Sequence, residues 1–187
     1  MDKDMREKAA KTAIDGFIVV ERIYRHAYQI LMTLKDKLKV EYNLKSESPI
    51  YNNFQSGADP ASWLYHFRGF FLAKAKISLD EYIDNEIPIL FFQASLYNLN
   101  KQEPIFRYGL IEKIFNFRTW KGARFDDYFR IVLIHIHSEQ QSGHIEADSC
   151  EAEVRFDEKP LLDIREDKDI ALLAEEIGDK YAKLLLE

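Results

Sequence analysis

Residues 3–41, KDMREKAAKTAIDGFIVVERIYRHAYQILMTLKDKLKVE, carry the pattern that decides the fold. Apolar and aromatic side chains recur there every seven residues in two sets. The first set is Ala10, Phe17, Tyr24, Leu31 and Leu38, and the second is Ala13, Val20, Ala27 and Leu34. Both sets fall on one face of an α-helix, so the pattern predicts a long N-terminal helix.

The width of the apolar stripe and the length of this helix indicate what the helix packs against. Four further apolar residues widen the stripe: Ile14 and Tyr28 on one side, Ile23 and Ile30 on the other. A wide face favours a helix that packs on the core of its own domain. Yet a helix over residues 3–41 would span about 58 Å, which exceeds the width of a domain of this size. We therefore expect part of the stripe to meet another chain, and we predict at least partial dimerisation.

After a polar loop the apolar period changes from about 3.6 to 2, which is typical of strands. The strand-like stretches are residues 70–77, 87–98, 105–117, 124–137 and 144–156, with a hairpin turn expected at 138–143. Few residues of 87–98 are polar, which predicts a central strand. From Glu166 the helical period returns, with Ile170, Leu173 and Ile177 on one side.

We therefore predict an α+β fold in a single domain over residues 1–187. A long N-terminal amphipathic helix (1–42) precedes an antiparallel β-meander of about five or six strands (60–165) and a C-terminal amphipathic helix (166–187). Antiparallel strands that follow one another can leave one sheet face to be covered by the two helices. A pocket lined by aromatic side chains inside the sheet stays open as an alternative.

Composition narrows the class of protein further. The charged start MDKDMREK and the lack of an 18-residue apolar run predict a cytoplasmic protein that does not enter a membrane. Cys150 is the only cysteine, which excludes an internal disulfide and a thiolate metal cluster. Residues 1–130 carry 20 Lys plus Arg against 17 Asp plus Glu, whereas residues 131–187 carry 6 against 15. The acidic final third disfavours broad polyanion binding, and leaves a basic partner or a second copy as candidates.

A histidine-rich segment is the sharpest candidate for chemistry. On the predicted strand, His135 and His137 are two residues apart and would leave the same face, while the expected hairpin would bring His144 and Glu146 opposite them. Three imidazoles and a carboxylate could hold zinc or iron for a hydrolase. Histidines are also ordinary at a strand end beside a polar turn, so we favour no metal and no other cofactor.

A second candidate lies in residues 105–130, where cationic and aromatic residues interleave. Its distinctive part is a predicted loop containing Arg118, Trp120, Lys121 and Arg124. An indole between cations suits a protein interface anchor or the stacking of single-stranded nucleic acid. We expect this loop to bind a protein partner, with nucleic acid as the less favoured alternative.

Other motifs give no support to a catalytic function. No glycine-rich phosphate loop or nucleophile elbow is present, and the one His-x-His pair, His135 and His137, fits none of the known patterns that contain such a pair. The sequence therefore favours a non-enzymatic protein-interaction or regulatory module that self-associates. A metal-dependent hydrolase and a single-stranded nucleic acid binder are the alternatives.

Overall fold

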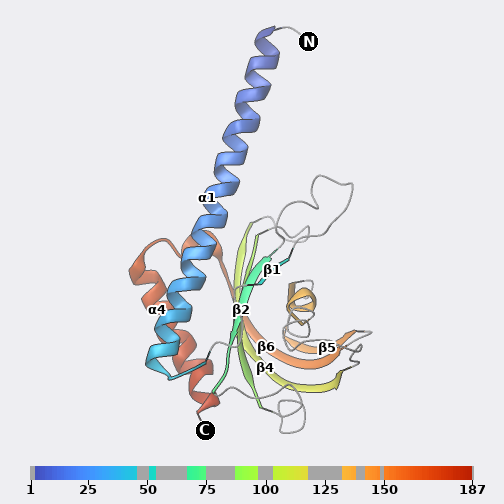
Figure 1. Ribbon diagram of the computed structural model, residues 1–187, viewed down its shortest axis with the longest axis vertical. Coiled ribbons are helices and arrows are strands. Elements are labelled where there is room, and N and C mark those ends of the chain that lie inside the picture. Colours follow the sequence, from blue (N-terminus) through green and yellow to red (C-terminus); the bar gives the residue numbers. More distant parts are fainter. Residues whose placement is uncertain are drawn as a thin grey trace.

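The computed structural model describes residues 3–45, 51–53, 67–74, 87–96, 103–117, 132–137, 142–147 and 150–186. Within these ranges a long N-terminal helix and a C-terminal helix lie against an antiparallel sheet (Figure 1). The predicted α+β class is therefore confirmed, including the N-terminal helix that the heptad pattern indicated.

The elements follow one another in a simple order. They are α1 (Lys3–Glu41), β1 (Tyr51–Asn53), β2 (Phe67–Leu72), β3 (Ile89–Ser95), β4 (Ile105–Phe117), β5 (Gly143–Ala147), β6 (Cys150–Pro160), η2 (Leu161–Asp163), α4 (Asp167–Ile177), η3 (Gly178–Ala182) and η4 (Lys183–Leu185). A further short helix occupies residues 132–137.

The six strands form one sheet in the order β1-β2-β3-β4-β6-β5, and all neighbouring strands are antiparallel. The first four follow chain order, as in a meander, but β6 lies between β4 and β5. In the centre of the sheet Gly109 faces Phe91 on β3 and Phe156 on β6. A Cβ at Gly109 would lie 2.0 Å from the Arg155 carbonyl oxygen, so only glycine allows β6 to approach this closely.

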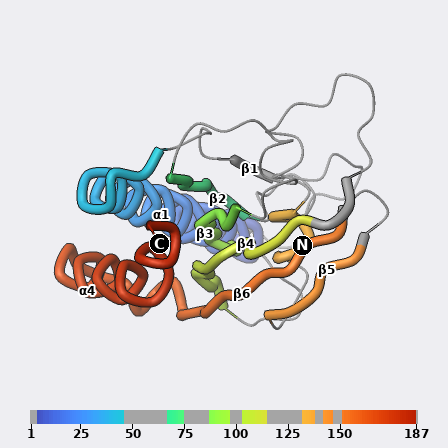
Figure 2. Tube along the Cα trace, turned by 90° about the horizontal axis from the view of Figure 1, so that it is seen from below, coloured from blue at the N-terminus to red at the C-terminus, as the bar shows by residue number. Residues whose placement is uncertain are grey.

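Both faces of the central strands are buried. On one face Phe70, Phe92 and Tyr108 belong to a core that includes α1 and α4, and the rings of Phe70 and Phe92 stack at 4.4 Å. On the other face Phe71, Phe91 and neighbouring side chains form a second core with the helix at 132–137. Figure 2 shows α1 and α4 together on one side of the sheet. All seven residues of β3 are buried, which confirms the predicted central strand.

Only the second half of α1 packs on this sheet. Ala27, Ile30, Leu31, Leu34 and Leu38 are completely buried against the sheet and α4. The helix ends at Glu41, and Asn43 follows with φ of 50°, in the left-handed conformation that commonly terminates helices. The N-terminal half of α1 extends beyond the rest of the domain (Figure 1).

Residues 132–137 differ from the prediction, because they form a helix and not the end of a strand. Val132, Leu133 and Ile136 are buried in the second core, at the i, i+1, i+4 spacing of one helix face. The hairpin predicted to turn at 138–143 is also wrong, since β5 begins at Gly143 and Ala147 already pairs with Cys150. A short apolar run such as IVLIHI fits either period, and packing against the sheet decides it.

The C-terminal helix begins and ends through specific local contacts. The Asp169 carboxylate accepts hydrogen bonds from the backbone N–H groups of Glu166 and Arg165, both at 2.9 Å, and these bonds lower the pKa of Asp169. At Gly178 the α-helix changes into the π-helical turn η3. The Tyr42 hydroxyl fills the space of the missing side chain, 1.8 Å from where a Cβ would lie.

A polar seam ties this C-terminal segment to the sheet. The Tyr108 hydroxyl donates a hydrogen bond of 2.6 Å to Glu176, which also forms an ion pair with Lys159. In parallel, the Tyr181 hydroxyl donates a bond of 2.9 Å to Asp157, which pairs with Lys180. The two tyrosine rings meet edge to face at 6.2 Å. Two strands and the C-terminal segment are thereby joined by charge-assisted hydrogen bonds.

The contacts within this polar seam shift the pKa values of its two carboxyl groups and its two tyrosines. Burial opposes the ionisation of Glu176 and Asp157, but the donated hydrogen bonds outweigh it and hold the pKa of both carboxyls below the ordinary value. Burial, together with the bonds to these carboxylates, raises the pKa of Tyr108 and Tyr181. At neutral pH the carboxylates are therefore charged and the phenols neutral.

We predict that the buried half of α1 stabilises the fold whereas exposed leucines do not. Leu34→Ala removes a fully buried side chain and should lower the free energy of unfolding by about 2–5 kcal/mol. Leu172→Ala makes the same substitution at a side chain that is 63% exposed, and should change the free energy of unfolding by about 0.5 kcal/mol or less. Urea denaturation of both variants is the measurement, and equal losses would contradict the assigned helix face.

We predict that acid weakens the seam. Because the folded-state pKa of Glu176 is lowered, its contribution to stability is present above the unfolded value, about 4.3, and is lost as the pH falls through the lowered one. Glu176→Gln should therefore reduce the difference in unfolding free energy between pH 7 and pH 3. Its neighbour Glu175 is exposed, so Glu175→Gln serves as the control. Identical pH profiles for both variants would rule out this role.

Candidate functional site

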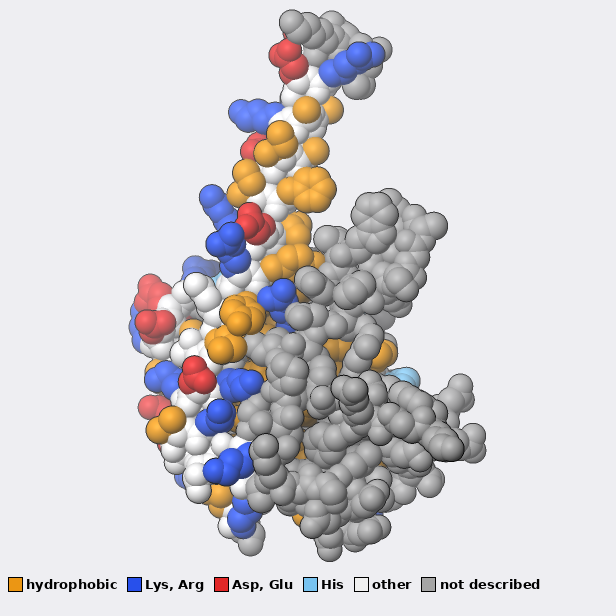
Figure 3. All heavy atoms as spheres, viewed as in Figure 1, with side chains coloured by type: hydrophobic (Ala, Val, Ile, Leu, Met, Phe, Trp, Pro, Cys, Tyr) orange, Lys and Arg blue, Asp and Glu red, His pale blue; other side chains and the backbone are white. Residues whose placement is uncertain are grey.

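The N-terminal half of α1 is the most distinctive surface among the described residues. We call residues 4–19 the free arm, because every side chain in this range is exposed. Its large apolar side chains are Met5, Ile14, Phe17, Ile18 and Val19, which are 57%, 59%, 72%, 40% and 54% exposed. Figure 3 shows hydrophobic side chains gathered along this arm. The heptad stripe that is buried in the second half of α1 thus continues into solvent.

An open pocket of 460 Å³ lies where the free arm joins the domain. It is lined by Glu21, Tyr24, Arg25, Tyr28, Gln29 and Arg68. Five of these residues belong to α1, and Arg68 comes from β2 near the edge of the sheet. The apolar stripe of the arm therefore leads directly into a partly aromatic hollow.

Charged groups surround the aromatic rings of this pocket. Arg25 forms an ion pair with Glu21 one helical turn earlier, at 2.6 Å. The Arg68 guanidinium lies 5.6 Å from the centre of the Tyr28 ring, at cation–π distance. Tyr28 is still 44% exposed. The pocket can therefore accept an apolar side chain against its rings and an ionic group at its rim.

The structure separates the predicted metal ligands. His135 and His137 lie on the helix at 132–137, where two residues correspond to a rotation of about 200°, so their side chains leave on nearly opposite sides. The predicted shared face is therefore wrong. The Nδ1 atom of His137 lies 3.0 Å from the Ser95 hydroxyl, and its ring lies 5.4 Å from that of Phe67.

The other two candidates are on β5. The Nε2 atom of His144 lies 3.1 Å from a carboxylate oxygen of Glu151. Glu146 is exposed and faces Glu151 in the register of β5 with β6. Within the described ranges, no three His, Cys, Asp or Glu residues are grouped closely enough to hold a metal ion. The hairpin geometry that suggested a zinc or iron site is not formed.

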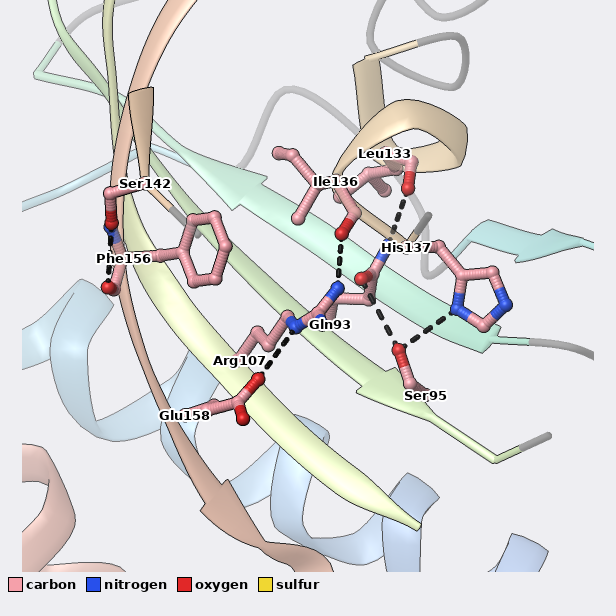
Figure 4. A network of polar contacts seen from close by, with 9 residues as sticks. All are labelled: Gln93, Ser95, Arg107, Leu133, Ile136, His137, Ser142, Phe156 and Glu158. Carbon is pink, nitrogen blue, oxygen red and sulfur yellow. Dashed lines mark hydrogen bonds and ion pairs between the residues drawn. The ribbon is translucent and has the colours of Figure 1, made fainter. Parts of the chain in front are cut away.

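Sequence reasoning missed a buried polar cluster between the sheet and the helix at 132–137 (Figure 4). Gln93 donates a hydrogen bond of 2.6 Å to the Leu133 carbonyl, and Ser95 donates one of 3.3 Å to Gln93. These bonds satisfy backbone and side-chain groups that the packing removes from water. The signal in the sequence is the polar pair Gln93 and Ser95 within an otherwise apolar strand.

Arg107 is the centre of the same cluster and is completely buried. It forms an ion pair of 3.2 Å with Glu158 and donates a hydrogen bond to the Ile136 carbonyl. Its guanidinium also lies 5.2 Å from the centre of the Phe156 ring. Arg107 lies in the segment 105–130 whose cations and rings suggested nucleic acid binding, and its complete burial excludes it from such a surface.

This cluster holds the short helix in place and does not form a catalytic centre. Ser95 and His137 are a hydroxyl and an imidazole at hydrogen-bond distance, which is the beginning of a nucleophilic dyad. However, Ser95 is only 1% exposed, so a substrate has no access to its hydroxyl. The hydrogen bonds to Leu133 and Ile136 instead fix the helix against β3 and β4.

The predicted partner-binding loop cannot be located in the structure. Arg118, Trp120, Lys121 and Arg124 all lie outside the described residues. Among the described helices, none combines the length and the apolar character needed to cross a membrane. Comparisons with known proteins found no matching family model, no similar curated protein and no similar solved structure.

We predict that the histidines bind no metal. Purified protein should contain far less than one equivalent of zinc or iron by elemental analysis, because His135 and His137 point apart. His135→Ala combined with His144→Ala should leave this content unchanged. One equivalent of metal that disappears in the double variant would restore the hydrolase interpretation.

Proposed function

We propose that this chain is a protein-interaction module without enzymatic chemistry, and that the free arm is its binding surface. The exposure of the arm's apolar stripe carries the proposal. Burial of one large apolar side chain is worth about 1.5–3 kcal/mol, so Ile14 and Phe17 left in water are a considerable source of binding free energy. Contiguous apolar surface of this kind marks interaction sites in soluble proteins.

The spacing within the arm fits recognition through a helix. Ala10, Ala13, Ile14 and Phe17 occupy positions i, i+3, i+4 and i+7, the usual anchor spacing of a helix that lies against a groove or a second helix. The opposite line contains Lys8, Asp15 and Arg22, which keep that side soluble. One face of the arm is thus suited to bind protein and the other to face water.

We predict that the arm contacts another protein inside cells. The test uses cells that express the chain from its own gene. A photo-crosslinking amino acid replaces Phe17 in one variant and Lys8, on the polar line, in a control. Irradiation should give covalent protein adducts from position 17 and few from position 8, because only the apolar face is buried in a complex. Mass spectrometry of the adducts identifies the partner.

The absence of adducts at both positions would contradict the proposed function. Phe17→Glu and Thr12→Glu complete the design, since both introduce one negative charge into the arm. Both residues are exposed, so each substitution should change the unfolding free energy by about 0.5 kcal/mol or less. Only Phe17→Glu should abolish the complex that the crosslinks define.

A further inference from the structure

The apolar stripe of α1 changes in size along its length. Far from the domain its seam residues are small, with Ala10 and Ala13, whereas close to the domain they are bulky, with Phe17, Val20 and Tyr24. The seam ends before Ala27, because this residue is completely buried in the chain's own core. A partner must therefore present large groups near the tip and small groups near the base.

A second copy of the arm meets this requirement when the two arms are antiparallel, because its bulky residues then lie near the tip of the first arm and its small residues near the base. We propose that two copies of the chain pair through antiparallel arms, with the two-fold axis beside residue 15; this rests on the proposed function of the arm. In this register Ala13 faces Phe17 of the second copy, Ala10 faces its Val20, and Arg6 faces its Tyr24. Each bulky side chain thus lies opposite an alanine or a flexible side chain.

A parallel pair lacks this complementarity. It would place Ala10 on Ala10 and Ala13 on Ala13, and Phe17 on Phe17 and Tyr24 on Tyr24 of the second copy. The helices would be too far apart at the small layers or too close at the bulky ones, and either arrangement loses packing. An antiparallel pair keeps one interhelical distance along the whole overlap, as closed two-fold symmetry requires of a self-complementary surface.

Spin-label distances across the dimer test the arrangement. Lys8, Asp15 and Arg22 share one heptad position and are all exposed, so labels there have the same lateral separation and stay outside the seam. The full chain with Cys150→Ser receives one cysteine at a time: Lys8→Cys, Asp15→Cys or Arg22→Cys. Each purified variant is spin-labelled and measured by double electron–electron resonance at tens of micromolar.

Antiparallel arms with this axis give the shortest distance at residue 15. At residues 8 and 22 the two labels are displaced along the helix by about 21 Å, since 14 residues separate the paired positions at about 1.5 Å each. The distances between the two labels at residue 8 and at residue 22 should therefore be equal, and both should exceed the distance at residue 15. Equal distances at all three sites, which indicate parallel arms, would overturn the proposal, as would unequal distances at 8 and 22.

Sedimentation equilibrium of the same variants supplies the mass. A dimer is expected, and a monomer of 22.1 kDa at all these concentrations would overturn the pairing. Crosslinks from position 17 to a different protein would then leave the proposed function intact, whereas the lack of any crosslink would remove both.

Discussion

The complete burial of β3 is the constraint on which the rest of the structure depends. A strand with all seven residues buried must be covered on both faces of its sheet. The second half of α1 and α4 cover one face, and the helix at 132–137 covers the other. The polar groups that become buried in this process, above all Arg107 and Gln93, each donate a hydrogen bond to the backbone of the short helix. Coverage of β3 therefore explains both the layers and the position of the buried polar cluster.

The free arm follows from a mismatch between α1 and the face that it covers. The buried residues of α1 that contact the sheet and α4 lie between 27 and 38, with Ile23 partly buried beside them, yet the same heptad pattern continues to Ala10. The sheet offers nothing for the additional heptads to cover, since the helix has already passed beyond it (Figure 1). A stripe that was needed only for this core would end near Tyr24. Its continuation in Phe17, Ile14 and Ala10 is the surface that we propose binds another protein.

The sequence predicted those elements whose period is unambiguous. The 3.6-residue period of α1, the long apolar run of β3 and the restart of helical spacing at Glu166 each allow one interpretation. Residues 132–137, VLIHIH, do not, because their apolar residues fit either period and three of the four are β-branched. Their helix also accepts hydrogen bonds from Gln93 and Arg107, which are distant in sequence. The alternative of a metal site required His135 and His137 on one face of a strand, and the helix removes that geometry. The pocket at the base of the arm also needs Arg68, which no local pattern connects to Tyr28.

The stability of the arm connects its local sequence to its binding. A helix of about 16 residues without tertiary contacts is only marginally stable in water. Gly16 and the branched residues Ile18, Val19 and Val20 weaken it further, although the packed half of α1 already provides the costly nucleus. The end of the arm should therefore fray when alone, and a partner that covers Phe17 would stabilise helix and complex together by linkage. With the proposed function, the helix-weakening residues on the apolar stripe make the helical order of the arm depend on the partner that it binds.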